Sequence, residues 1–299
     1  MKILLATDGS EHAEIAAKFL TRLDLSSSDE VTVLHVTNWV PFQDDMESHY
    51  RSLKYFREQI SPRILDASVD ILKPVKAGIT VAEEEGYPDL AIMDVAARYN
   101  ADLIVVGAKG IKGITSFFVG SVARSVAINS SKPVLVVNVP LAEMSSGPMR
   151  ILFAADGSSS AVSTASFLAS IPFPEDTELM IMNVVNSAIS DVPERFFLEI
   201  SDKIKEDVAR ARTEEFKMSK KIIDETRPYL SQRFKKIDSL TKIGDPSIEI
   251  LDSAEILNAD IIAVGCRGLK GIKGMMGSVS RRILSHARCS VLIGKTGAS

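Results

Sequence analysis

Residues 87–110, YPDLAIMDVAARYNADLIVVGAKG, contain a helical pattern, an uninterrupted apolar run and a glycine-punctuated loop in direct succession. Residues 245–268, DPSIEILDSAEILNADIIAVGCRG, repeat this succession at an offset of 158 (245 − 87). A helix that leads into a strand with apolar residues on both faces is typical of a parallel sheet covered by helices on both sides. The chain therefore contains the same α/β segment twice.

The duplication extends outward from this segment over nearly the whole chain. KILLATDGSEHA returns as RILFAADGSSSA, which aligns Asp8 with Asp156 at an offset of 148 (156 − 8). The second strand of each copy aligns Val36 with Val184, and KPVLVV near the end of the first copy matches CSVLI in the second. We predict two domains, residues 1–140 and 150–299, joined by a linker over 141–149 that is rich in Pro, Ser and Gly.

Within each copy the pattern alternates between strand and helix, which predicts right-handed crossovers and a doubly wound, parallel α/β domain. In the second copy, a long amphipathic helix is expected over residues 195–234, with a break near Pro228. In the first copy, strands are expected at 3–7, 31–36, 75–79, 102–107 and 133–138, and helices at 12–23, 88–100 and 121–129.

Composition limits the classes of function. The 299 residues carry a net charge of −4, which does not favour a nucleic-acid partner. The apolar run at the N-terminus is too short for a signal peptide, and no run has the length of a membrane span. Only Cys266 and Cys289 are present, so we expect no disulfide framework and a cytoplasmic location.

The glycine loop points to phosphate chemistry. Gly107, Gly110 and Gly113 would remove side chains where a ligand approaches the backbone and would permit positive φ. Gly120 and Ser121 then open a helix whose first N–H groups favour an anion, and Lys109, like Arg267 in the second copy, supplies positive charge. The spacing matches neither a Walker A loop nor GxGxxG. The alternative is that the glycines only form tight turns.

With Asp8 at the end of the first strand, Gly107-x2-Gly110-x9-Gly120-Ser121 resembles the pattern of ATP-binding universal stress proteins, here in tandem. The resemblance implies two Rossmann-like domains of the adenine nucleotide alpha hydrolase-like type, with ATP, AMP or ADP as ligand, with or without Mg²⁺. It implies a first site at Ala6, Asp8, Val36, Val106, Gly107, Lys109, Gly110, Gly120, Ser121 and Val122. The corresponding second site is Ala154, Asp156, Val184, Val264, Gly265, Arg267, Gly268, Gly277, Ser278 and Val279.

The resemblance also implies what each part of the first site contacts. Asp8 accepts from the ribose or the base, the backbone of Val36 recognises the adenine edge, and the loop and helix start surround the phosphates. The second copy departs from the pattern, because eight rather than nine residues separate Gly268 from Gly277. We therefore predict that the second site binds nucleotide more weakly than the first.

Other reactive side chains have simpler interpretations. The four histidines share no metal-ligand spacing, and His35 lies in an apolar strand as a satisfied interior residue. Ser10 and His12 follow Asp8 at a strand-to-helix turn, where helix capping is favoured over a hydrolytic triad. Cys266 is a redox candidate or a small tolerated residue. Trp39 and Phe42 follow the second strand, and three interpretations stay open for them: a lid, a partner surface or a loop packed on its own domain.

Three functions remain open at this point. The leading hypothesis is a cytoplasmic, nucleotide-dependent stress-response or regulatory protein without efficient catalysis, at most a slow ATPase, with no catalytic residue and no metal ligand assigned. The second is an adenine-nucleotide hydrolase or nucleotidyl transferase on the same fold, and the third is a nucleotide-free interaction module. The resemblance further implies pairing of the two domains through their last strands, within one chain or in a homodimer. The net charge and the short apolar runs predict no nucleic-acid or membrane partner.

Overall fold

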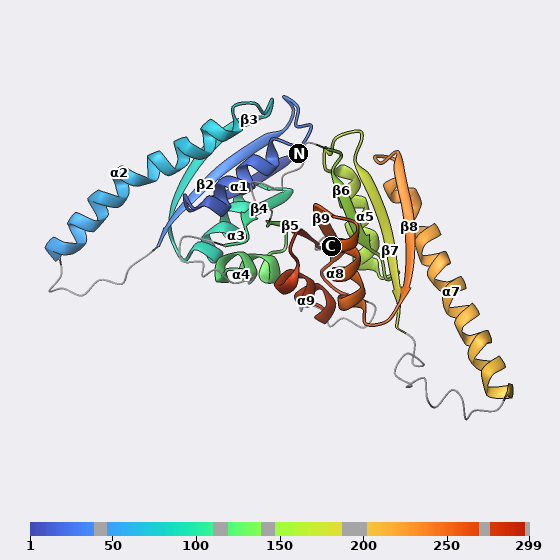
Figure 1. The fold of residues 1–299 in the computed structure, drawn as a ribbon. Helices are drawn as coiled ribbons and strands as arrows, with labels where there is room; N and C mark the ends of the chain where they lie inside the picture. Colours follow the sequence, from blue (N-terminus) through green and yellow to red (C-terminus); the bar gives the residue numbers. More distant parts are fainter. Residues whose placement is uncertain (39–46, 110–118, 139–146, 187–201, 269–275, 297–299) are drawn as a thin grey trace.

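The structure is a computed structural model that describes all residues except 39–46, 110–118, 139–146, 187–201, 269–275 and 297–299 (Figure 1). The first half comprises β1 (Lys2–Thr7), α1 (Glu11–Leu20), β2 (Glu30–Asn38), α2 (Glu47–Leu72), β3 (Gly78–Gly86), α3 (Pro88–Arg98), β4 (Leu103–Gly107), α4 (Ser121–Asn129) and β5 (Val134–Val137). The second half comprises β6 (Arg150–Ala154), α5 (Ser159–Ser170), β7 (Glu178–Val185), α7 (Asp202–Leu230), β8 (Lys236–Ile243), α8 (Pro246–Ile256), β9 (Ile261–Gly265), α9 (Ser278–His286) and β10 (Ser290–Gly294).

The strands form one ten-stranded sheet in the order β3-β2-β1-β4-β5-β10-β9-β6-β7-β8. Within each half every neighbouring pair is parallel. The two halves meet where β5 pairs antiparallel with β10, with Leu135 opposite Leu292. In the first half the strand order reverses at β1, which lies between β2 and β4. Such a reversal leaves a crevice beyond the carboxyl ends of the strands.

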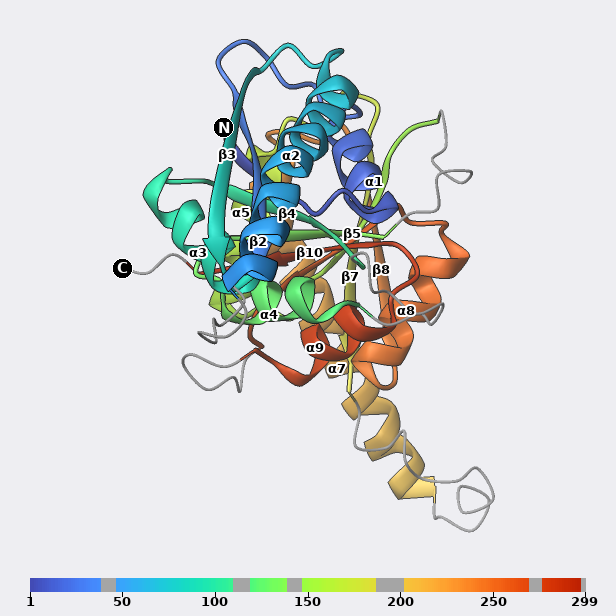
Figure 2. The ribbon, with the colours of Figure 1, turned by 90° about the vertical axis from the view of Figure 1, so that its left-hand side faces the viewer.

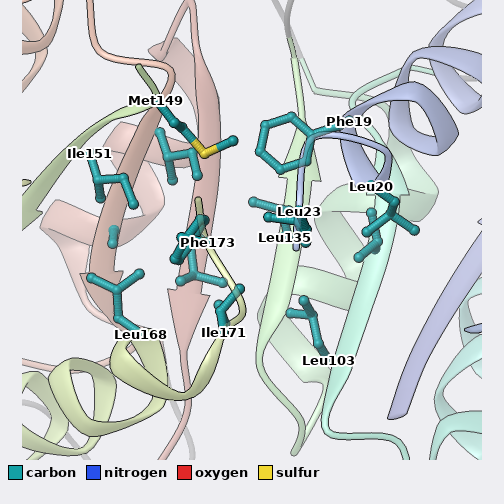
Figure 3. Close-up of a cluster of buried hydrophobic side chains, with 14 of the residues drawn as sticks. Phe19, Leu20, Leu23, Leu103, Leu135, Met149, Ile151, Leu168, Ile171 and Phe173 are labelled. Atoms are coloured by element: carbon teal, nitrogen blue, oxygen red, sulfur yellow. The ribbon is translucent and has the colours of Figure 1, made fainter. Parts of the chain in front are cut away.

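Helices cover both faces of the sheet, and the apolar layer on each face crosses from one half to the other. One layer contains side chains of α1, α2, α5 and α7, and the other contains side chains of α3, α4, α8 and α9. Figure 3 shows part of the first layer, where Phe19 and Leu135 of the first half lie in one cluster with Met149 and Phe173 of the second. The two halves thus share a continuous core. The long helices α2 and α7 lie at the two ends of the molecule (Figure 1).

The residues that follow the last strands fasten each half to a helix of the other. Lys295, after β10, donates from Nζ to the carbonyls of Ala127 (2.8 Å) and Ile128 (3.1 Å) in the last turn of α4. Asn138, after β5, donates from Nδ2 to the carbonyl of Ala287 at the end of α9 (3.1 Å). Burial lowers the pKa of Lys295 below its ordinary value. An ammonium at a helix C-terminus complements the helix dipole.

Some element boundaries differ from the sequence predictions. The third strand was expected over residues 75–79, but β3 covers Gly78–Gly86 and includes three consecutive glutamates. It is an edge strand, so the exposed side chains of Glu83 and Glu85 remain in solvent. Helix α7 continues through Pro228 and ends two residues later at Leu230, short of the predicted end at residue 234; residues 195–201 lie outside the described part. Helix α2 had no counterpart in the sequence prediction.

Candidate functional site

A cavity of about 640 Å³ lies beyond the carboxyl ends of β1, β2 and β4, where the strand order of the first half reverses. This volume falls within the range usual for small-molecule sites, about 300–1,000 Å³. Its walls come from the strand ends, from α2 and α3, and from the start of α4. The lining residues are Ala6, Thr7, Asp8, Ala13, Leu34, His35, Val36, Thr37, Asn38, Ile60, Ser61, Ile64, Pro88, Ile92, Val106, Gly107, Ala108, Lys109, Gly120, Ser121, Val122 and Ala123.

The structure brings the described residues of the first predicted site together around this cavity. They are Ala6, Asp8, Val36, Val106, Gly107, Lys109, Gly120, Ser121 and Val122. Gly110 and Gly113 lie outside the described residues, as do Trp39 and Phe42. The sequence prediction missed the wall from α2, formed by Ile60, Ser61 and Ile64, because it assigned no helix there.

The tip of β1 is held by a turn that fixes the position of Asp8. Gly9 adopts φ 75°, and the backbone N–H of Ser10 donates to Oδ1 of Asp8 at 3.1 Å. Ser10 is the N-cap of α1, as expected, because its Oγ accepts from the N–H of Ala13 at 3.3 Å. The same hydroxyl lies 3.5 Å from the carbonyl of Lys109, to which it donates. The strand tip, the helix start and the glycine loop are therefore tied together.

The start of α4 has no cap from the side chain of its own N-cap residue. Its N-cap is Gly120, which has no side chain to cap with, whereas Ser10 caps α1 and Asp245 caps α8. The N–H of Gly120 itself donates to the carbonyl of Ala108 at 2.7 Å and fixes the end of the loop. The first residues of α4, Ser121 and Val122, line the cavity. Their N–H groups, the helix dipole and the nearby Lys109 favour an anionic ligand.

Gly107 also has a packing role that the sequence analysis did not identify. A Cβ at this position would lie 2.5 Å from the carbonyl oxygen of His12, so the residue must be glycine for β4 to pass the start of α1. It is not among the described glycines with positive φ. Gly265 is equivalent, because a Cβ there would lie 2.8 Å from Oγ of Ser160. The demand for glycine at this point of both loops thus comes from strand–helix packing.

His35 is a satisfied interior residue, as expected. It is 8% exposed, and its Nδ1 lies 2.9 Å from the carbonyl of Thr7, which makes Nδ1 the protonated ring nitrogen in this contact. In the second half Asn183 takes its place and donates from Nδ2 to the carbonyl of Ala155 at 2.7 Å. Both side chains cross-link the ends of the first two strands of their half.

The second predicted site gathers at the corresponding corner of the second half. The N–H of Ser158 donates to Oδ1 of Asp156 at 3.0 Å, as Ser10 does to Asp8. A Cβ at Gly268 would lie 2.9 Å from Oδ2 of Asp156, so this carboxylate rests against the glycine loop. The guanidinium of Arg267 donates to the hydroxyl of Thr296.

The remaining members of the second site lie at the strand ends and at the start of α9. Ala154 pairs with Val264 at the ends of β6 and β9, next to Gly265, and Val184 lies near the end of β7. Gly277 is the N-cap of α9, without a side-chain cap, and Ser278 and Val279 follow it as the first residues of the helix.

The two cysteines differ in their environments. Cys266 is buried, and its Sγ lies 3.6 Å from Oγ of Ser160. Desolvation acts to raise the pKa of Cys266, but hydrogen bonds, foremost with Ser160, outweigh it and leave the pKa below its ordinary value. Burial raises the pKa of Cys289 to about 12. Cys266 also packs in the apolar layer of α8 and α9, which fits a structural side chain.

Side chains typical of metal sites do not cluster in the described residues: no group of three or more His, Cys, Asp or Glu is close enough to hold an ion. The described helices likewise include none with the length and apolar character needed to cross a bilayer.

The fold and the cavity define a duplicated, doubly wound α/β protein with a small-molecule cavity at the strand-order reversal of its first half. The chain belongs to the universal stress protein family, whose sequence model matches residues 1–138 and again 148–295. A universal stress protein of Methanocaldococcus jannaschii is 33% identical over 150 residues, covering 48% of this chain and 84% of its own length.

Two longer relatives match both halves of the chain. A universal stress protein of Mycolicibacterium smegmatis is 20% identical over 297 residues, covering 97% of this chain and 96% of its own length. The crystal structure of a universal stress protein from Archaeoglobus fulgidus superimposes with a TM-score of 0.63 at 22% identity and covers 99% of this chain and 96% of that one. At these identities the likeness extends to the fold of the whole tandem chain.

Proposed function

We propose that this universal stress protein binds an adenine nucleotide, ATP in the first instance, in the cavity of its first half. The observation that carries the proposal is the coincidence of three features in one cavity of about 640 Å³. Asp8 stands at the tip of β1, the uncapped start of α4 presents its N–H groups, and Lys109 adds a cation beside them. A carboxylate for the ribose or base at one side and donors for phosphate at the other suit a nucleotide.

The lining also supports a regulatory role over a catalytic one. Among the described residues that line the cavity, Asp8 is the one carboxylate, and it belongs to β1 rather than to the α4 side where we place the phosphates. A hydrolase needs a group that positions or deprotonates water next to the γ-phosphate. We therefore propose that the nucleotide acts as a regulatory ligand, with at most slow hydrolysis, and that Mg²⁺, when present, accompanies the phosphates.

We propose a second, weaker site at the corner formed by Asp156 and the loop of Gly268. The loop is one residue shorter than in the first half. The shorter loop supports the weaker affinity, because the loss of one charge-assisted donor costs about 1.5–3 kcal/mol. The two free cysteines fit a cytoplasmic location, which we propose as well.

Calorimetric titration of the full chain with ATP tests the proposal. We expect one tight site per chain and a second, weaker phase, with heat released on binding at each. GTP at the same concentrations serves as the control for base recognition and should bind more weakly. Absence of any saturable binding of ATP, ADP or AMP would refute the proposed function and leave the nucleotide-free interaction module.

A further inference from the structure

The hydroxyl of Ser61, on α2, is a buried polar group without a partner beside the candidate cavity. Ser61 is 1% exposed, and its Oγ has no hydrogen-bond partner in the described part of the chain. Oγ1 of Thr177 and Oε2 of Glu215 share this state, but of the three residues only Ser61 lines the cavity. Buried hydroxyls are almost always bonded, so an exception at the wall of a cavity calls for an explanation.

The corresponding serine of the second half has the hydrogen-bond partner that the Ser61 hydroxyl lacks. Ile64 of α2 packs against Gly9, and Ile222 of α7 packs against Gly157, so the two helices correspond at an offset of 158 (222 − 64). Ser61 therefore corresponds to Ser219 (61 + 158), which is also 1% exposed. Oγ of Ser219 is hydrogen-bonded to Oγ1 of Thr241 on β8 at 2.8 Å.

The first half has a carboxylate side chain at the position of that threonine. In β8, Thr241 lies opposite Asn183 of β7, and in β3 Glu83 lies opposite His35 of β2. These two pairs occupy the same position in the two halves of the sheet. Glu83 is exposed. The first half therefore has the serine, Ser61, but no counterpart of the Thr241 hydroxyl that bonds to Ser219 in the second half. A bound ligand or an ordered water in the cavity can supply the missing partner.

The sheet order indicates which part of a ligand Ser61 meets. Because Ser219 bonds to Thr241, which lies opposite Asn183, Ser61 lies on the β2–β3 side of the cavity, at the level of His35. The start of α4, where phosphate donors gather, follows β4 on the other side of β1. Figure 2 shows α2 running along β2 and β3. Ser61 is therefore on the nucleoside side of the cavity.

We propose that the Ser61 hydroxyl hydrogen-bonds the polar edge of the nucleotide base and is a base-binding residue of the first site. The inference rests on the proposed function, because it assigns one more contact to the same ligand. A hydroxyl can donate to a ring nitrogen or accept from an exocyclic amino group, so it suits either group on the edge of adenine. Because Oγ is buried in the ligand-free chain, the Ser61 side chain must rotate toward the cavity to form this bond.

The test compares Ser61→Ala with the wild-type chain in calorimetric titrations with ATP and with AMP. We expect the affinity of the tight site to fall about tenfold, which corresponds to about 1.4 kcal/mol, and to fall equally for both ligands because the contact is to the nucleoside. The melting temperature of the ligand-free variant should not fall, because the lost hydroxyl had no protein partner.

Ser219→Ala is the matched control, since it removes the corresponding hydroxyl of the second half, which is hydrogen-bonded to Thr241. We expect it to lower the melting temperature and to leave the affinity of the tight site within twofold of wild type. If the wild-type chain binds no adenine nucleotide, the proposed function itself fails. If the wild type binds but Ser61→Ala binds ATP and AMP as tightly, or loses affinity for ATP alone, the assignment of Ser61 to the base is wrong and the proposed function stands.

Discussion

Replacing Gly294 with valine is expected to destabilise the whole chain by about 3 kcal/mol, at the upper end of the usual cost of overpacking a core. Gly294 ends β10 in the middle of the ten-stranded sheet. A Cβ at this position would lie 2.0 Å from Oγ1 and 2.5 Å from Cγ2 of Thr164, a residue of α5 with 0% exposure. Thr164 cannot turn away freely, because its hydroxyl donates to the carbonyl of Ser160 at 2.7 Å. Urea unfolding of both proteins measures the difference.

The first half suggests how the clash can be relieved. At the positions that correspond to Gly294 and Thr164 it has Val137 and Ala16, both buried in the same apolar layer. The double variant Gly294→Val/Thr164→Ala should therefore recover most of the lost stability. Gly78→Val is the matched control, since a Cβ there would lie 3.9 Å from the nearest atom, the carbonyl of Asp29. A Gly294→Val chain within about 1 kcal/mol of wild type would show that α5 can move away from the sheet at little cost.

Replacing Asp8 with alanine is expected to weaken ATP binding at the tight site by about ten- to a hundredfold. The loss of a charge-assisted hydrogen bond to the ribose or base costs about 1.5–3 kcal/mol. Asp8 lines the cavity at the tip of β1, where the adenosine is proposed to lie. Calorimetric titration with ATP measures the change.

Asp156→Ala separates ligand binding from structural effects, because the two aspartates have the same structural bond. Each accepts from the N–H two residues later, at 3.1 Å for Asp8 and 3.0 Å for Asp156. The two variants should therefore lose similar amounts of stability. Only Asp8→Ala should weaken the tight site, whereas Asp156→Ala should affect the weaker phase. The opposite assignment would place the better nucleotide site in the second half.

The sequence predicted the elements that physical constraints mark most clearly. Strands such as β1 and β4 are buried on both faces, so they appear as short apolar runs, and the repeat doubles the signal. The edge strand β3 was misplaced because one side of it faces solvent and tolerates Glu83–Glu85. Helix α2 carries a proline, Pro62, within its length, and its polar surface obscures the helical period. The antiparallel register of β5 with β10 depends on packing between distant segments, which no local pattern encodes.

The candidate site could be predicted in part. The described residues of the first glycine loop and the tip of β1 line one cavity, because the carboxyl ends of parallel strands meet at one edge of the sheet. The reason for Gly107 was not predictable, since it depends on the approach of β4 to the backbone of His12. Ser61 lies in a helix that the sequence did not reveal. Only the comparison of its environment with that of Ser219 and Thr241 distinguishes it.

The central claim is that the first half holds an adenine nucleotide between the tip of β1 and the start of α4. The most direct measurement is a crystal structure of the full chain grown with ATP. The account predicts adenosine between Asp8 and Val36, with phosphate oxygens accepting from the first N–H groups of α4 near Ser121. An empty cavity at saturating ATP, or a nucleotide bound in the reverse direction with its base at α4, would contradict it.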